Sequence, residues 1–269
     1  MIKKAVISIS KEDLGLIPSL LTLPKELWSL GGISLIQRII SELKDSGIEE
    51  IIIVVPYEKK VVIDYLKELT SSSDLFKGIN FSYITQKNSL GHGHSMLQSE
   101  KMMGEDDFGF SLSDNLIHSK NSCFSQLTNV FRTSQKPVVA LRRIEEGVPA
   151  FSYVKVEKIA NRFYKIKSFV DEIDPGDDSY EFVLAGRGVL TPTTFDYLRK
   201  IKASKTKVMT FTRAFDIMIK DGKTIYGYEI EGQWLQCNNR LNLMKSDLFL
   251  SLNDQDFGPE LKKYLNEII

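Results

Sequence analysis

The chain has 269 residues, of which 42% are hydrophobic and 26% charged, an ordinary composition for a globular protein. Its 35 basic side chains (Lys and Arg) balance 35 acidic ones, which argues against a nucleic-acid binder and against a polybasic membrane anchor. The apolar run Ala5–Ile9 is too short for a signal peptide, no run approaches a membrane span, and the two cysteines lack CxxC spacing, so we expect a cytoplasmic protein.

The first half of the chain alternates between strand-like and helix-like patterns. Strands are expected at Ala5–Ser10, Ile51–Val55, Phe81–Thr85, Phe108–Leu112 and Val138–Leu141. Helices are expected between them at 35–43, 61–69, 93–103 and 123–134. The run IIIVV at Ile51–Val55 is typical of a strand buried on both faces. This alternation predicts an α/β fold with right-handed crossovers: a doubly wound, Rossmann-like, mixed and mostly parallel sheet.

The second half of the chain is less regular. Strands are expected at 152–156, 163–170 and 182–190 without helices between them, which predicts a β-rich insertion from about Val148 to Gly188. Helices then return at 193–200, 212–220, 239–250 and 258–268, with a strand at 224–230. The cluster DPGDDS at Asp174–Ser179 predicts a turn. We expect a single domain over 1–269, with halves 1–147 and 148–269.

Three loops follow strands of this sheet, where ligands gather in parallel α/β folds. The first loop, Ser10–Leu30, holds LPKELWSL with Lys25 and Glu26. The second loop reads QKNSLGHGHS over Gln86–Ser95, and the third ends the strand that leads to Asp114. A glycine-rich turn before a helix can cradle a phosphate or can be a plain connection. Each loop taken alone leaves both readings open.

Taken together, the loops carry a family resemblance. The motifs KKAVIS, LPKELWSL, QxxxLGxGHS, LSDN and LAGRGVLTP occur in this order from Lys3 to about Leu250. In this pattern the chain resembles the sugar-1-phosphate nucleotidyltransferases, and among them the bacterial UTP–glucose-1-phosphate uridylyltransferases. The resemblance implies magnesium-dependent conversion of UTP and glucose 1-phosphate to UDP-glucose and pyrophosphate. It implies a nucleotide side in 1–147, a sugar side in 148–269, and a uridine nucleotide or sugar nucleotide as ligand, and it is compatible with a homo-oligomer.

The nucleotide side of that family has counterparts here. Lys25 stands at the catalytic lysine that neutralises the triphosphate, and the resemblance implies uracil contacts for Glu26, Gln86 and Gly91. An amide offers both a donor and an acceptor to a base, and a glycine lets the ring approach the backbone. The resemblance also assigns Ser10 and Lys11, after the first strand, to nucleotide binding.

The metal and sugar sides have counterparts as well. Asp114 stands at the family's magnesium ligand, and a hard cation prefers such an oxygen. The position of the second metal ligand is Gln236 in this chain. Gly186, with Arg187 beside it, matches the family's glycine–arginine pair next to the sugar, and Asp171 lies at the sugar side.

Several phosphate-binding positions depart from the family. The family's glycine-rich loop G-x-G-T-R and its following lysine become Lys11–Gly15 and Leu21, with acidic Glu12 and Asp13. The sequence V-E-K-P becomes Val170–Ile173, which puts Glu172 at the lysine, and D-C-G becomes Gln236-Cys237-Asn238. Two hypotheses follow. The chain is a uridylyltransferase that uses substitute residues, with Arg142, Arg143 and Arg213 as candidates, or a non-catalytic relative that binds a uridine nucleotide or a protein partner.

Other residues have simpler interpretations. His92 and His94 form an HxH pair, but two histidines without a third ligand argue for a structural role of His94 at the start of a helix. Trp28 and Trp234 are expected to pack rather than to stack on a sugar. Cys237 is expected in the core, as free cysteines usually are.

Overall fold

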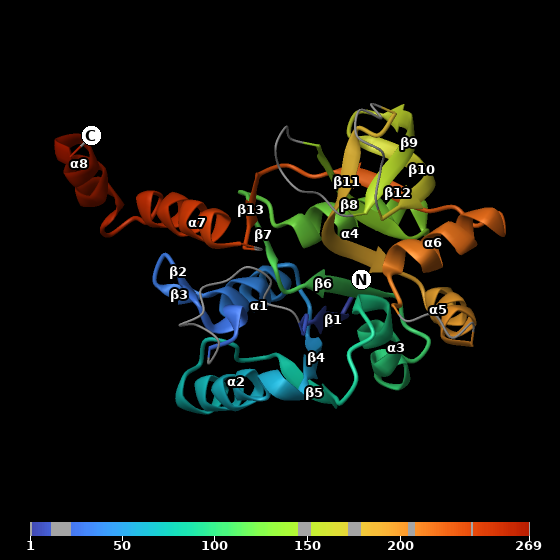
Figure 1. The fold of residues 1–269 in the computed structure, drawn as a ribbon, viewed down its shortest axis with the longest axis horizontal. Coiled ribbons are helices and arrows are strands. Elements are labelled where there is room, and N and C mark those ends of the chain that lie inside the picture. The colour runs from blue at the N-terminus through green and yellow to red at the C-terminus, as the bar shows by residue number, and fades with distance from the viewer. Residues whose placement is uncertain are drawn as a thin grey trace.

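The computed structural model describes residues 2–11, 23–144, 152–171, 179–203, 208–237 and 239–268. Within these residues a nine-stranded mixed sheet has the order β5-β4-β1-β6-β11-β8-β12-β10-β9 (Figure 1). In chain order its strands are β1 (Lys4–Ser8), β4 (Glu50–Pro56), β5 (Asn80–Gln86), β6 (Phe108–Leu112), β8 (Val138–Arg143), β9 (Tyr153–Ala160), β10 (Phe163–Val170), β11 (Phe182–Leu190) and β12 (Tyr226–Glu229). Strands β5, β4, β1 and β6 run parallel, and β11 joins β6 in the opposite direction.

Helices cover both faces of the sheet. Helices α1 (Leu35–Asp45), α2 (Val61–Ser72) and α4 (Cys123–Ser134) share one apolar cluster with Ala5 and Ile7 of β1. Helices α3 (His92–Met103), α5 (Thr193–Ala203) and α6 (Phe211–Lys220) share a second cluster with Val6. Because neighbouring strand residues point to opposite faces, β1 contributes to both cores. The predicted doubly wound α/β fold is confirmed.

The predicted β-rich insertion extends the same sheet. Strands β9 and β10 form an antiparallel hairpin, and β10 pairs with β12 so that the hairpin continues the sheet edge. Strand β11 also pairs with β9 through Phe182 and Val183. The turn predicted at 174–179 lies almost wholly outside the described residues.

Most predicted boundaries agree with the structure to within a few residues, but short elements were missed. These are the 3-10 helices η2 (Lys25–Leu27) and η3 (Tyr57–Lys59), the ribbon of β2 (Ser29–Leu30) and β3 (Ile33–Ser34), and the pair β7 (Asn115–His118) and β13 (Gln233–Gln236). Such elements are too short to show hydrophobic periodicity. The longer α1 was predictable because Ser34 and Gln37 form a reciprocal capping box at its start.

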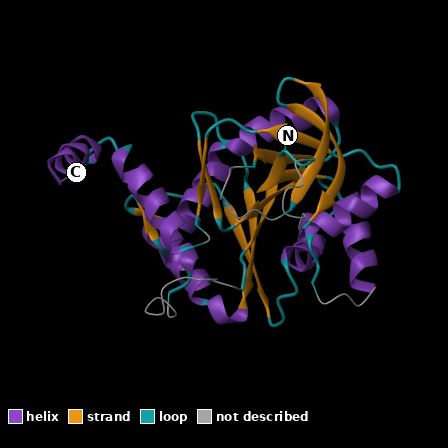
Figure 2. Cartoon of the chain, turned by 45° about the horizontal axis from the view of Figure 1, so that its top comes forward, coloured by secondary structure: helices purple, strands orange, loops and turns teal. Residues whose placement is uncertain are grey.

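The last two helices project from the rest of the molecule. Helices α7 (Arg240–Leu252) and α8 (Gly258–Ile268) follow β13 and lead away from the sheet (Figures 1 and 2). We call these two helices the arm. No helix in the described part of the chain is long and apolar enough to cross a bilayer.

Candidate functional site

Several of the predicted site residues, among them Lys25, Gln86 and Asp114, lie at the carboxyl ends of the parallel strands. Strand pairing sets Ser8 at the end of β1 level with Leu112 at the end of β6. The next pair along sets Pro56 of β4 level with Gln86 of β5. The loops that follow these strands therefore meet along one edge of the sheet, where α/β proteins bind their ligands.

Lys25 and Asp114 face each other at this edge. Lys25 begins η2 directly after Pro24, and its side chain is 5% exposed. Its Nζ lies 3.8 Å from Oδ2 of Asp114, whose side chain is 25% exposed. Asn115 Nδ2 donates to the other carboxylate oxygen at 2.8 Å. Lys25 and Asp114 are 89 positions apart in the chain. The fold brings their opposite charges together at a partly exposed surface.

Glu26 is more deeply buried than Lys25. Its side chain is fully buried, with Lys59 Nζ at 3.1 Å and Ser113 Oγ donating at 2.9 Å. The Lys59 side chain, from η3, is itself only 5% exposed. A buried carboxylate needs such partners because an unpaired charge in the interior is very costly. The sequence reasoning missed Lys59 and Ser113, and only their places at the ends of β4 and β6 could have indicated them.

Gln86 and Gly91 lie next to one another at the start of α3. The Gln86 side chain donates to Ser95 Oγ at 2.8 Å, and its Oε1 lies 3.1 Å from His94 Nδ1. Gly91 caps the helix with φ of 100°, and a Cβ there would lie 2.7 Å from the Met209 carbonyl oxygen. Glycine is therefore required at this position by both backbone conformation and space.

The two histidines of the HxH pair have separate partners. His94 contacts Gln86 and Gln98, whereas His92 Nδ1 lies 2.9 Å from Ser8 Oγ. Burial lowers the pKa of both histidines; for His92 the Asp114 carboxylate opposes this shift, and Lys25 adds to it. In the described residues no group of three or more His, Cys, Asp or Glu side chains is placed to hold a metal.

Gln236, which the resemblance sets at the second metal-ligand position, lies close to Asp114. Strands β7 and β13 pair Asn115 with Gln236, and the Cys237 amide donates to the Asp114 carbonyl at 3.2 Å. The Gln236 Oε1 accepts from Asn242 at 3.3 Å. Burial raises the pKa of the Cys237 thiol to about 12, so the thiol is an unsuitable ligand. Magnesium is commonly held by one or two carboxylates together with substrate phosphates. One carboxylate and one amide oxygen fit that donor set.

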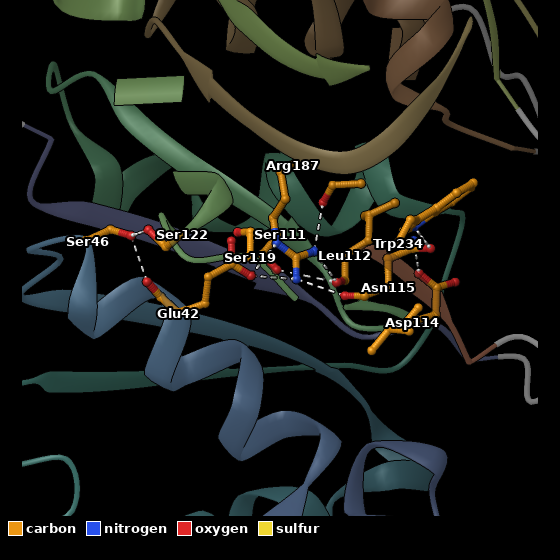
Figure 3. Close-up of polar contacts among 12 residues, drawn as sticks. Glu42, Ser46, Ser111, Leu112, Asp114, Asn115, Ser119, Ser122, Arg187 and Trp234 are labelled. Carbon is orange, nitrogen blue, oxygen red and sulfur yellow. Dashed lines mark hydrogen bonds and ion pairs between the residues drawn. The ribbon is translucent and has the colours of Figure 1, made fainter. Parts of the chain in front are cut away.

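The Arg187 side chain points from β11 toward Glu42 of α1 and toward Leu112 and Asn115, on either side of Asp114 (Figure 3). Its fully buried guanidinium donates to Glu42 Oε2 through Nε (3.2 Å) and Nη2 (3.1 Å), and to the carbonyls of Leu112 and Asn115. The arginine thus ties β11 to α1 and to the segment that carries Asp114. Its surroundings are those of a structural residue.

The two residues expected on the sugar side have different surroundings, Gly186 beside β6 and β7 and Asp171 beside α6. Gly186 has φ of 70°, and a Cβ there would lie 2.9 Å from Asn115 Nδ2. Asp171 accepts from Thr212 Oγ1 at 2.6 Å and lines a cavity of about 340 Å³ together with Arg213 and Lys200. Of the three arginines expected as substitute cations, Arg213 shares this cavity with Asp171.

The loop after β1 is described only at its start. Ser10 follows β1, and Lys11 forms an ion pair with Glu58 at 2.7 Å. Arg142 and Arg143, the other two arginines expected to replace the missing cations, have partners elsewhere. Arg142 donates to the Ile230 carbonyl, and Arg143 forms ion pairs with Glu181 and Glu229. Glu12, Asp13, Leu14, Gly15, Leu21, Glu172 and Asn238 lie outside the described residues.

A doubly wound sheet with a lysine–aspartate pair and a glycine-capped helix at its carboxyl edge defines an α/β nucleotide-binding class of protein. A family model described as nucleotidyl transferase matches residues 16–238. The chain therefore belongs to the nucleotidyl transferase family.

Similar proteins agree with this assignment. The UTP–glucose-1-phosphate uridylyltransferase of Staphylococcus haemolyticus is 27% identical, over 99% of this chain and 98% of the relative. A solved UDP-glucose pyrophosphorylase in complex with UDP-glucose is 27% identical, with a TM-score of 0.83, over 92% of this chain and 97% of that chain. A UTP-bound UGPase from Acinetobacter baumannii, 22% identical with a TM-score of 0.85 over both full chains, shows the same fold.

Proposed function

We propose that this chain is a uridylyltransferase that makes UDP-glucose and pyrophosphate from UTP and glucose 1-phosphate. The observation that carries the proposal is the Lys25–Asp114 pair, with Gln236 beside it, at the carboxyl edge of the parallel strands. The names of the similar proteins supply the substrates. In this reaction an oxygen of the sugar phosphate attacks the α-phosphorus of UTP, the bond to the β-phosphate breaks, and pyrophosphate leaves.

Each side chain of the edge has a part in this proposal. Lys25 neutralises phosphate charge, which is the main contribution a protein makes to phosphoryl-type transfer. Asp114 and the Gln236 amide would hold magnesium, which neutralises the phosphates further when it is bound. Gln86 and Gly91 contact the edge of the uracil base. Glu26, held in place by its ion pair with Lys59, lies beneath the base. Ser10 and Lys11 lie toward the triphosphate, and Asp171 and Gly186 toward the sugar.

The proposal also covers the two halves of the domain, the cell compartment and the binding partners. We place the nucleotide side in 1–147 and the sugar side in 148–269 of one domain, in the cytoplasm. The partners are a uridine nucleotide, a hexose phosphate and further copies of the chain.

The second candidate function is uridine-nucleotide binding without turnover. It is favoured by the acidic residues Glu12, Asp13 and Glu172, which stand where the family has neutral or basic groups. A pyrophosphate-release assay with UTP, magnesium and a panel of sugar phosphates separates the two candidates. Turnover of ~1–10³ s⁻¹ supports the enzyme. No release, with uridine nucleotide bound in calorimetry, supports the second candidate.

A further inference from the structure

His92 lies at the carboxyl edge of the sheet, and the proposed function gives it no part. It is the first residue of α3 and follows Gly91 directly. Its Nδ1 lies 2.9 Å from the Oγ of Ser8, at the end of β1. Its ring stacks on Phe211 of α6, with ring centroids 6.2 Å apart. Contacts with β1 and α6 therefore fix the orientation of the ring.

The Ser8 hydroxyl determines which ring nitrogen of His92 carries the hydrogen. Ser8 is 2% exposed, and His92 Nδ1 is the only hydrogen-bond partner of its Oγ among the described residues. If Nδ1 donated to this oxygen, the hydroxyl hydrogen would be buried without an acceptor, which is costly. The hydroxyl therefore donates to Nδ1. Burial lowers the pKa of His92, so the ring is neutral near pH 7 and carries its one hydrogen on Nε2.

The Nε2 atom is the open end of the His92 ring. Within the described part of the chain it has no hydrogen-bond partner and is not among the buried atoms that lack one, so solvent reaches it. After burial, the charges of Asp114 and Lys25 are the further influences on the pKa of His92, so both lie close to the ring. The Nε2–H group is thus a donor that the fold holds in place near Lys25.

We propose that His92 donates a hydrogen bond from Nε2 to a phosphate oxygen of UTP, and that Ser8 positions the ring for this contact. The inference rests on the proposed function for the identity of the ligand. A hydrogen bond to an ionised phosphate is stronger than one between neutral groups. The Lys25 ammonium and the positive amino end of α3 both favour an anionic acceptor over an uncharged one at this place.

The two histidines of the HxH pair then have different roles. Residues two positions apart on a helix do not face the same side. His94 accordingly contacts Gln86 and Gln98, whereas His92 contacts Ser8. His94 supports the fold around Gln86, and His92 serves the ligand.

Isothermal titration calorimetry of the full chain with UTP, UMP and uridine tests the proposal. His92→Phe keeps a ring against Phe211 but has no donor, so we expect its affinity for UTP to fall about tenfold or more while uridine binds as before. An equal fall for UMP would assign the contact to the α-phosphate, and a fall for UTP alone would assign it to the β- or γ-phosphate.

Three further variants separate the donor from the shape of the ring. His92→Gln places an amide donor near the position of Nε2 and should recover most of the affinity for UTP. Ser8→Ala keeps the ring but removes the hydroxyl that orients it, so its loss should be smaller than that of His92→Phe. The matched control, His118→Gln at an exposed histidine outside the site, should bind UTP like the unaltered chain. Circular dichroism checks that each variant is folded.

Nitrogen NMR of the labelled histidines gives a signal that a purely structural role would not move. The chain has three histidines, and the variants identify the signal of His92. We expect hydrogen on Nε2 without ligand, and a shift of the Nε2 resonance with UTP but not with uridine. Hydrogen on Nδ1, or equal affinity for UTP in His92→Phe and the unaltered chain, or an equal loss for uridine, overturns the inference and leaves the proposed function standing. An unaltered chain that binds no UTP overturns both.

Discussion

At the scale of single residues, the proposed phosphate-binding role of Lys25 can be tested most directly. Lys25 lies 3.8 Å from Asp114, and the proposed function assigns its charge to the phosphates of UTP. In Lys25→Met we expect the affinity for UTP to fall about 10- to 100-fold, because one charge-assisted hydrogen bond contributes about 1.5–3 kcal/mol. The affinity for uridine, which has no phosphate, should hardly change. Isothermal titration calorimetry measures both.

The control for this variant is Lys101→Met on α3, where the lysine is exposed. It should leave both affinities unchanged. If Lys25→Met binds UTP as tightly as the unaltered chain, the phosphate role of Lys25 is wrong.

His94 predicts a pH dependence of stability. Burial lowers its pKa, and the neutral ring lies between Gln86 and Gln98. Below about pH 6.5 the unfolded chain takes up a proton that the folded His94 resists, so the free energy of unfolding falls as the pH drops. We expect His94→Gln to lose less stability than the unaltered chain between pH 7 and pH 5 in urea unfolding. Equal slopes in the unaltered chain and in His94→Gln would contradict the prediction.

At the scale of elements, the Arg187–Glu42 pair joins β11 to α1. Both side chains are buried, 0% and 8% exposed, so removing one partner leaves a charge in the interior. Arg187→Met should lower the free energy of unfolding by about 3–5 kcal/mol. The double variant Arg187→Met, Glu42→Met should be more stable than the single one, because it leaves no unpaired charge. Denaturant unfolding of both variants checks this, and additive losses would exclude the coupling.

The loop after β1 carries the largest departure from the family pattern. By the family resemblance, Glu12 and Asp13 would put negative charge near a bound triphosphate, and one close like-charge pair costs about 4 kcal/mol at an effective dielectric of 20. The family-like loop is restored by Lys11→Gly, Asp13→Gly, Leu14→Thr, Gly15→Arg and Leu21→Lys. We expect this variant to bind UTP more than tenfold more tightly and uridine about equally. If the unaltered chain already binds UTP at micromolar strength with magnesium, the charge argument is wrong.

At the scale of the whole molecule, the two cysteines report on opening of the fold. Cys123 and Cys237 are free and fully buried, and burial raises the pKa of both thiols. Because the thiolate is the reactive form, a thiol reagent at pH 8 should label the folded chain only through opening. Both cysteines should react fully in denaturant, with rates in native buffer that follow the free energy of unfolding. Rapid labelling of either cysteine without denaturant would show that the cores are looser than described.

Local patterns in the sequence were sufficient for the longer elements and for the order of the site loops. The continuous β-branched run of β4 and the capped amphipathic α1 each carry their own periodicity, so their type could be predicted without knowledge of their neighbours. The motifs that place the chain in its family are also local in sequence.

Only the tertiary structure decided which side chains meet. The burial of Glu26 against Lys59, the turn of Arg187 toward Glu42, and the short pair that sets Gln236 beside Asp114 all join segments distant in the chain. The exposure of Leu241, Met244 and Leu248 on α7 was equally hidden from the sequence, because an apolar repeat predicts a buried face whether or not the fold covers it. Contacts of this kind depend on how the sheet brings its strand ends together, and neither periodicity nor spacing contains that information.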